Sequence, residues 1–271
     1  MVFYRNLIFV LFFSIFLSCS DDLYIEPALK IPTINIEINN FEEINSKDDY
    51  VKGTFEFNSG DYDFEDFVQP IKIRGRGNST WDMPKKSYQF KLEEKHNLFN
   101  FPEDKKWLML ANYSDKTMLR NALAFELGYL SKLDWTPNYH FAEVVINGKA
   151  KGLYQFTEKV ETGDDNRVKI GDEGFLLEVD QLSRIDFDDI SFWTEKKLLF
   201  VVKDPDLESG SSELEKIKSY VIQTENVLYS EEFDDPFNGY SKYIDVDSFV
   251  DWYLINEISK NNDAIFFSSV Y

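Results

Sequence analysis

The residues whose types and spacing are best suited to binding or catalysis lie in the run IKIRGRGNSTWDMPKKSYQFKL, residues 71–92. Arg74 and Arg76 alternate with glycines there, and Asn78 and Ser79 follow them. Backbone N–H groups at glycines can approach phosphate oxygens closely, and arginine adds positive charge. The run therefore predicts an anion site, with phosphate as the first candidate. It lacks a third glycine and does not open a helix, so glycines that only make a bulge and a turn remain an alternative.

Two adjacent lysines, Lys85 and Lys86, add to this positive charge. Lys86 alternates with polar residues and shares a strand face with Tyr88, Phe90 and Leu92. A lysine on such a face is costly to bury unless it is paired, and Glu158 or Glu126 could be the partner. A lysine held by a glutamate and directed at phosphates is the arrangement of protein kinases. The alternative is an ordinary surface lysine beside another lysine.

Asp263 is the candidate carboxylate near the end of the sequence, in the run KNND. A carboxylate just past a helix end can orient a hydroxyl group or hold a metal ion, although Asn-Asn-Asp is also common in turns. The two histidines, His96 and His140, are far apart and have no cysteine or histidine neighbours. A zinc site or a histidine-based triad is therefore not expected.

The first residues predict export. Arg5 precedes an apolar run, Leu7 to Leu17, that is short for a membrane span but typical of a signal peptide. Cys19 is the single cysteine, and the letters FLSC that it ends resemble a bacterial lipobox. We therefore expect a lipoprotein signal at 1–18, a tether at 19–30, and an outer-membrane or cell-surface lipoprotein anchored through lipid on Cys19. A plain cleaved signal peptide with an incidental cysteine is the alternative.

The charge balance limits the partners. The sequence of 271 residues has 49 acidic and 29 basic side chains and a formal net charge of −20. Such a surface repels nucleic acids and anionic lipid headgroups, so neither is expected as a general partner. The length is sufficient for one large domain or two lobes with a real core.

Hydrophobic patterning predicts a mainly-β part at 31–205 and a helical part at 206–271, an α+β class. Asn147-Gly148 between two apolar runs is a strong hairpin signal. The predicted strands are Ile31–Ile38, Lys52–Phe57, Val68–Arg74, Lys86–Leu92, Trp107–Tyr113, Phe141–Ile146, Gly152–Thr157, Phe175–Val179 and Leu198–Val202.

Three helices are predicted. One begins at Asp115 with an apolar stripe through Leu123 and Leu130, one follows a capping box at Ser212, and a mostly buried one runs from Asp247 to about Lys260. Pro70 is expected to place its strand at an edge or near a strand start. The sequence ends within the strand-like run IFFSSVY, so we expect an incomplete helical lobe.

Four blocks, in order, resemble the spore coat protein H (CotH) kinase family over roughly residues 69–271. They are IRGRGNSTWDMPKKSYQFKL, WLMLANYSDKTMLRNALAFELG, EVVINGKAKGLYQFTEKVE and NEISKNNDAIFFSSVY. The resemblance implies a divergent protein-kinase fold. It also implies transfer of phosphate from ATP, with Mg²⁺ or Mn²⁺, to Ser or Thr of an extracytoplasmic protein.

The resemblance also implies roles for particular residues. Residues 74–80 would line the phosphates, Lys86 with its neighbour Lys85 would bind the nucleotide, Glu158 would pair with Lys86, and Asp263 would receive the proton of the substrate hydroxyl. Asp115, Arg120 and Asn121 match a family block as well, and we interpret them as a helix cap and its neighbours.

The sequence departs from the family pattern in two places. Ser268-Ser269 stands where the family often has a metal-binding Asn. The family's Trp-Asp-Phe-Asp segment, with its main metal-binding carboxylate, would be expected beyond Tyr271. The sequence could therefore represent an inactive fragment. The alternatives are a non-catalytic surface lipoprotein that binds a glycan or a protein, and a structural lipoprotein without a ligand.

Overall fold

The computed structural model describes residues 29–163, 167–264 and 269–270. The described residues from Ile31 onward belong to one compact unit. Cys19 and the predicted signal peptide lie outside the described residues. Within the described ranges, no helix has the length and apolar character needed to cross a membrane.

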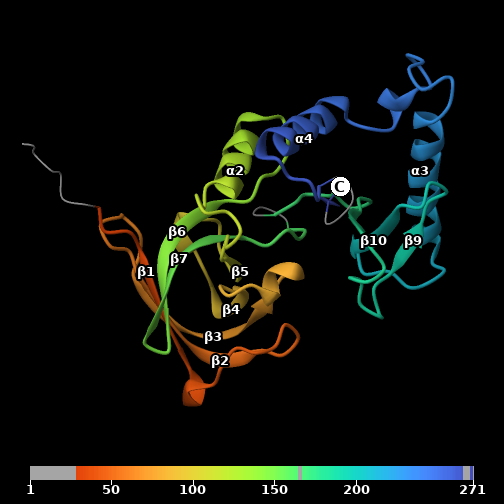
Figure 1. The fold of residues 1–271 in the computed structure, drawn as a ribbon. Helices are drawn as coiled ribbons and strands as arrows, with labels where there is room; N and C mark the ends of the chain where they lie inside the picture. The colour runs from red at the N-terminus through yellow and green to blue at the C-terminus, as the bar shows by residue number, and fades with distance from the viewer. Residues whose placement is uncertain (1–28, 164–166, 265–268, 271) are drawn as a thin grey trace, which may run out of the picture. The chain divides into compact units, whose positions relative to one another are not determined.

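A closed seven-stranded barrel holds the first part of the chain (Figure 1). Neighbouring strands are antiparallel except where β1 meets β6 in parallel, with Ile34 opposite Val144, and this pairing closes the barrel. Closure removes the free strand edges at which another chain could pair. In barrel order the strands are β1 (Thr33–Ile38), β2 (Val51–Asn58), β3 (Phe67–Arg76), β4 (Ser87–His96), β5 (Asp104–Leu110), β7 (Lys149–Glu158) and β6 (Tyr139–Ile146).

Alternation along each strand fills the barrel with apolar side chains. Phe55 and Phe90 are fully buried, and their rings stack with centroids 5.1 Å apart. Trp107 of β5 and Phe156 of β7 are also fully buried. The opposite strand faces carry polar residues, because successive side chains of a strand point to opposite sides of a sheet. The interior is therefore a packed core, and ligand sites must lie at the barrel's ends or on its outer face.

The predicted strands are present, with shifted ends. The hairpin of β6 and β7 turns at Asn147 and Gly148, both with positive φ, as the Asn-Gly pair predicted. The edge position predicted from Pro70 is wrong, because β3 lies between β2 and β4. Proline has no backbone N–H to donate to a neighbouring strand. Pro70 is tolerated because it pairs with β2 only, since the pairing of β3 with β4 starts at Ile71.

A second, four-stranded sheet follows in the order β11-β8-β10-β9. Its strands are β8 (Leu176–Asp180), β9 (Ser191–Trp193), β10 (Leu199–Asp204) and β11 (Ser269–Val270). Patterning did not predict β9, which is only three residues long. The pairing of β11 with β8 joins residues about ninety apart in sequence, such as Ser269 and Val179. The fold is therefore α+β and mainly β.

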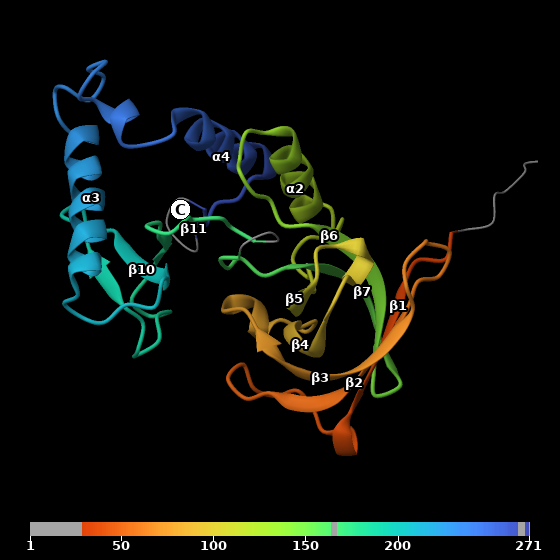
Figure 2. The ribbon, with the colours of Figure 1, turned by 180° about the vertical axis from the view of Figure 1, so that it is seen from behind.

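The α-helices of the described ranges are α2 (Arg120–Leu130), α3 (Ser212–Leu228) and α4 (Val246–Ser259), and α2 and α4 pack against each other (Figure 2). Each begins differently from the prediction. Residues 115–119 form turns before α2, Ser211 caps α3 through the N–H of Leu214, and Asp245 caps α4. A cap needs a side-chain oxygen within reach of a free N–H, so local geometry chooses among neighbouring candidates.

The prediction that the last helix is mostly buried is wrong for the described residues, and much of the apolar stripe of α2 is exposed as well. Leu123 and Leu130 of α2 are 45% and 85% exposed, and Phe249 and Tyr253 of α4 are 39% and 51% exposed. An apolar stripe predicts which face of a helix prefers burial. Whether that face is covered depends on what the rest of the fold places opposite it.

Candidate anion-binding site

The connection from β3 to β4 carries the glycines singled out in the sequence. A Cβ atom on Gly75 would lie 2.2 Å from the ring of Trp81, so only glycine lets that indole pack against β3. Gly77 has a φ of +99°, which favours glycine. A short 3-10 helix, Ser79–Asp82, follows. Both glycines therefore have structural roles and fix the path of the chain around Arg76, although Gly75 pairs with Tyr88 in regular register and makes no bulge.

Beside this connection lies a pocket of about 340 Å³. Three cations contribute to its wall, Arg76 from the end of β3, Lys85 from just before β4, and Arg120 from the start of α2. The other lining residues are Thr80, Met83, Ser87, Leu110, Ala111, Asn112, Tyr113, Ser114, Asp115 and Asn121. We refer to this hollow as the cationic pocket.

Two of the three cations have no acidic partner among the described residues. Arg76 is partly buried and forms no ion pair there, and burial lowers its pKa. The Lys85 Nζ atom donates to the carbonyl oxygens of Ala111, at 3.2 Å, and of Leu153, and it lies 4.2 Å from the centroid of the Tyr154 ring. Burial lowers the pKa of Lys85 as well. A bound anion would offset the free-energy cost of burying these two positive charges.

The carboxylate in the wall of the pocket already accepts hydrogen bonds from neighbouring residues. Asp115 accepts the N–H of Arg120 at 2.8 Å and the hydroxyl of Thr117 at 2.7 Å, and the bond from Arg120 is the main cause of its lowered pKa. Asp115 therefore holds the N–H of the first residue of α2 from the preceding turn, although the N-cap position belongs to Leu119 and not, as predicted, to Asp115. The sequence interpretation did not foresee that Arg120 and Asn121 would also line the pocket. Their place beside Asp115 in a family block was the signal that could have indicated it.

An amide chain supports the same wall. Asn121 donates to the side-chain oxygen of Asn112 at 3.0 Å, and Asn112 donates to the fully buried Gln155 at 2.7 Å. This chain ties α2 to β7 and fixes the position of Arg120 at the helix start. A positively charged side chain on a rigid element loses less entropy when it binds an anion.

Three residues predicted to contact phosphate lie outside this pocket. Arg74 stacks on Tyr50 at 4.9 Å from the ring centroid and donates to the carbonyl of Asp48. Asn78 and Ser79 are exposed at the start of the 3-10 helix and do not line the cationic pocket. Arg74 shares the outer face of β3 with Arg76, but its position two residues earlier directs it to a different neighbour.

The predicted pair of Lys86 and Glu158 is not formed. The Lys86 ammonium donates to the carbonyl of Trp81 and lies 4.4 Å from the centroid of the Trp81 ring. Glu158 accepts from Arg167 at 2.7 Å and from the backbone N–H of Asn138 at 2.8 Å. Glu126, the other candidate, accepts from the hydroxyl of Tyr139. Lys86 thus satisfies its charge with a carbonyl and an aromatic face, which sequence spacing did not reveal.

Glu158 belongs instead to a buried ionic cluster at one end of the barrel. Arg167 lies between Glu158 and Asp104, at 2.7 Å and 3.0 Å, and all but 1% of its side chain is buried. Its guanidinium stands 5.6 Å from the centroid of the Trp107 ring. Burial raises the pKa of Glu158, and the bonds from Asn138 and the charge of Arg167 oppose that rise. The sequence analysis missed Arg167, which no recognisable motif marks.

Asp263 lies in an exposed turn after α4, three residues past Lys260, which ends the helix in a left-handed conformation. It is not among the residues that line the cationic pocket. Ser268 is outside the described residues, and Ser269 begins β11. The described structure therefore does not bring the predicted catalytic aspartate to the predicted phosphate-binding residues.

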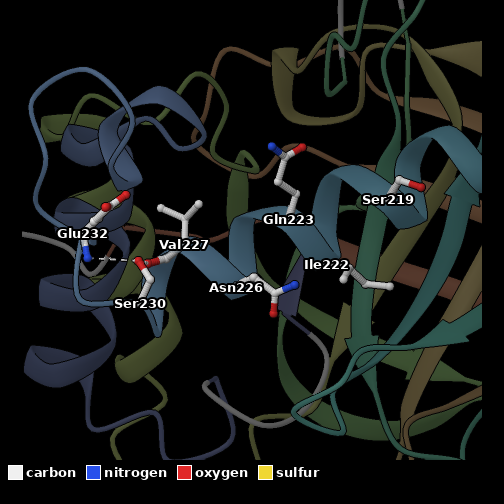
Figure 3. A pocket seen from close by; sticks show the side chains of 7 residues that line it. All are labelled: Ser219, Ile222, Gln223, Asn226, Val227, Ser230 and Glu232. Carbon is white, nitrogen blue, oxygen red and sulfur yellow. Dashed lines mark hydrogen bonds between the residues drawn. The ribbon is translucent and has the colours of Figure 1, made fainter.

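Another hollow, of about 480 Å³, lies along α3 and the turn after it (Figure 3). Its wall consists mainly of uncharged side chains, among them Gln223, Asn226 and Ser230, and Ser230 accepts the backbone N–H of Glu232. With one carboxylate and no cation, this wall is unsuited to phosphate.

The described residues fit an anion better than a metal ion. Within them, no group of three or more His, Cys, Asp or Glu side chains could hold a metal. The single carboxylate of the cationic pocket, Asp115, already accepts bonds at both oxygens. Divalent cations prefer carboxylate oxygens, so this wall by itself is a poor metal site. Its cations and amide donors suit phosphate oxygens.

Residues 73–271 match the family model described as CotH kinase protein. The chain belongs to the CotH family. No curated protein matches the sequence. Every residue of the cationic pocket lies within the CotH match, whereas β1 and β2, which complete the barrel, lie before it.

Proposed function

We propose that this protein is a protein kinase that transfers phosphate from ATP to Ser or Thr of an extracytoplasmic protein. The observation that carries the proposal is the cationic pocket. In the part of the chain that the structure describes, Arg76 and Lys85 face this hollow without an acidic partner, in a chain of net charge −20. Membership of the CotH family supplies the reaction class. The proposal includes a divergent protein-kinase arrangement in which the barrel provides the phosphate-binding part.

In this proposal Arg76, Lys85 and Arg120 hold the phosphates of ATP. A pocket of about 340 Å³ suits the phosphate groups rather than a whole nucleotide. Positive groups placed where charge develops stabilise the transferring phosphoryl group. The substrate hydroxyl oxygen would form a bond to the γ-phosphorus as the bond to ADP breaks. Family resemblance assigns the hydroxyl proton to Asp263, which would have to approach the pocket that it does not line in this structure. Mg²⁺ or Mn²⁺ is part of the proposal through the family.

Nucleotide binding and transfer can be tested separately. Mg-ATP should raise the melting temperature of the protein, because a ligand that binds only the folded state stabilises it. Phosphate transfer from radiolabelled ATP to a general acceptor protein should then be measured for the wild type and for Asp263→Asn. We expect the variant to retain the melting shift and to lose transfer by at least about a hundredfold, as expected for removal of a general base.

Unchanged transfer by Asp263→Asn would remove this aspartate from the proton-accepting role. Absence of any melting shift with Mg-ATP would contradict the kinase proposal for this chain. In that case, binding of a glycan or a protein by a non-catalytic module becomes the better description.

We also propose that the protein is exported and anchored to the outer membrane or cell surface through lipid on Cys19. The support is the apolar run before Cys19 and its lipobox-like setting. Cells expressing the protein should incorporate a labelled fatty acid into it, and Cys19→Ser should abolish the labelling. Equal labelling of both proteins would contradict the anchor.

A further inference from the structure

A second basic hollow adjoins the cationic pocket. It has a volume of about 610 Å³ and lies among the segment after β1, the start of β4 and the β6–β7 hairpin. Four lysines line it, namely Lys85, Lys86, Lys149 and Lys151. We refer to it as the lysine pocket. Its acidic residues are Glu42 and Glu43, so lysines outnumber glutamates by two to one in a chain where acids exceed bases.

The lysines of this pocket are available for an external anion. Among the described residues none of the four forms an ion pair, and Lys149 and Lys151 are exposed on the hairpin strand β7. Lys85 and Lys86 are held in place by backbone carbonyls and by the rings of Tyr154 and Trp81. Like charges gathered without counter-charges repel one another, and an anionic ligand removes that repulsion.

The hairpin that carries two of these lysines is fixed to the barrel. The side chain of Asn147 accepts the N–H of Ile38 at 2.8 Å and donates to the carbonyl of Glu42 at 3.3 Å. These bonds join the hairpin turn to the end of β1 and to the segment that forms the opposite wall. The pocket is therefore largely preformed, which reduces the entropy lost on binding.

The two pockets share part of their walls. Lys85 and Tyr113 line both the lysine pocket and the cationic pocket. A ligand in the lysine pocket would therefore lie next to phosphates held by Arg76 and Lys85. This is where the acceptor of a transferred phosphate would be expected if the proposed function holds.

We propose that the lysine pocket binds an acidic peptide segment of the protein substrate, next to the Ser or Thr that accepts phosphate. The wall combines the lysines with Ile44, Ile146 and Tyr154, so carboxylates and aliphatic side chains can both be accommodated. The net charge of −20 disfavours long polyanions. A short segment interacts mainly with the nearby lysines, because salt at physiological concentration limits the range of the interaction between exposed charges to about 8 Å. The assignment of the segment as acceptor rests on the proposed kinase function.

The test measures peptide binding without nucleotide. A fluorescein-labelled peptide of alternating Glu and Ser should bind the wild type, and its affinity should fall with added salt. Peptides with Gln or Lys in place of Glu should bind more weakly. Lys149→Glu/Lys151→Glu should weaken binding of the acidic peptide by at least about tenfold, the effect of about 1.4 kcal/mol. Both lysines are exposed, so the variant should melt near the wild-type temperature.

A matched control is Lys72→Glu/Lys91→Glu, which makes the same change in net charge. These lysines are exposed cross-strand neighbours on β3 and β4 and lie outside the lysine pocket. The control should bind the acidic peptide within about twofold of the wild type after correction for the general charge effect. Equal loss in both variants would overturn the proposal, since net charge alone would then explain the binding. Preference for the Lys peptide would overturn it too.

The melting shift with Mg-ATP separates this proposal from the kinase proposal. Lys149→Glu/Lys151→Glu should keep the wild-type shift, which supports two distinct sites. Loss of that shift would overturn the proposal by assigning the lysine pocket to the nucleotide. A wild type that binds the acidic peptide but shows no shift would support the peptide site and contradict the proposed kinase function.

Discussion

Arg76→Ala should weaken nucleotide binding by about tenfold to a hundredfold, the range expected when a charge-assisted hydrogen bond worth about 1.5–3 kcal/mol is lost. Arg76 lines the cationic pocket, lacks an acidic partner among the described residues, and has a pKa lowered by burial. Without nucleotide, the same change should leave the melting temperature unchanged or raise it, because it removes a desolvated charge. Melting curves at increasing Mg-ATP concentrations measure both effects.

Arg74→Ala is the matched control for this experiment. Arg74 is on the same strand face two residues earlier, but it stacks on Tyr50 and does not line the pocket. It should keep the wild-type response to Mg-ATP. If Arg74→Ala loses the response and Arg76→Ala keeps it, phosphate binds elsewhere on the β3–β4 connection and the pocket assignment is wrong.

Arg167→Ala should lower the free energy of unfolding by about 3–5 kcal/mol, the usual effect of leaving a buried charge without its partner. Arg167 is the cation between Glu158 and Asp104, at 2.7 Å and 3.0 Å, at one end of the barrel. Both carboxylates would lose that charge, and the ring of Trp107 would lose its cationic neighbour. Urea unfolding followed by tryptophan fluorescence measures the change. Lys132→Ala, which breaks an exposed pair with Asp247, should have little effect.

The stability of Arg167→Ala should also depend on pH in a particular way. Burial raises the pKa of Glu158 and Arg167 opposes the rise, so removing Arg167 should raise that pKa further. A carboxyl group whose pKa is raised on folding binds its proton more tightly in the folded state. Its stabilising contribution is therefore present at low pH and is lost as pH rises from 4.5 through the raised pKa.

The deficit of Arg167→Ala relative to the wild type should therefore be largest near neutral pH and should shrink as Glu158 becomes protonated. Glu158→Gln/Arg167→Met, in which neither charge remains, should recover part of the lost stability and flatten the pH dependence. A deficit that grows on acidification would show that the cluster does not control stability in this way.

Short-range patterns were sufficient for the strands and for the hairpin. The Asn-Gly pair at Asn147 and Gly148 defines its own turn, because the required positive φ values are a property of those two residues. Alternation at Tyr88, Phe90 and Leu92 likewise identified the buried face of β4. Closure of the barrel was not predictable in the same way, because the pairing of β1 with β6 joins segments about a hundred residues apart.

The distinction between Lys85 and Lys86 shows where sequence reasoning reached its limit. Both lysines precede β4, which begins at Ser87, so strand alternation does not decide their directions. Lys85 lines the cationic pocket, whereas the Lys86 ammonium lies against Trp81. The sequence identified the pair but favoured Lys86, because a lysine on the apolar face seemed to require a carboxylate partner.

The sequence by itself determined the mainly-β character of the chain, its family, and the basic stretch around Arg76 on which the site is built. These properties depend on residue type, spacing and the order of local blocks. The tertiary structure decided which side chains meet: Arg120 joins Arg76 and Lys85, and Glu158 binds Arg167 instead of Lys86. Partners of buried charges come from distant parts of the chain, and only the path of the folded backbone brings them within contact distance.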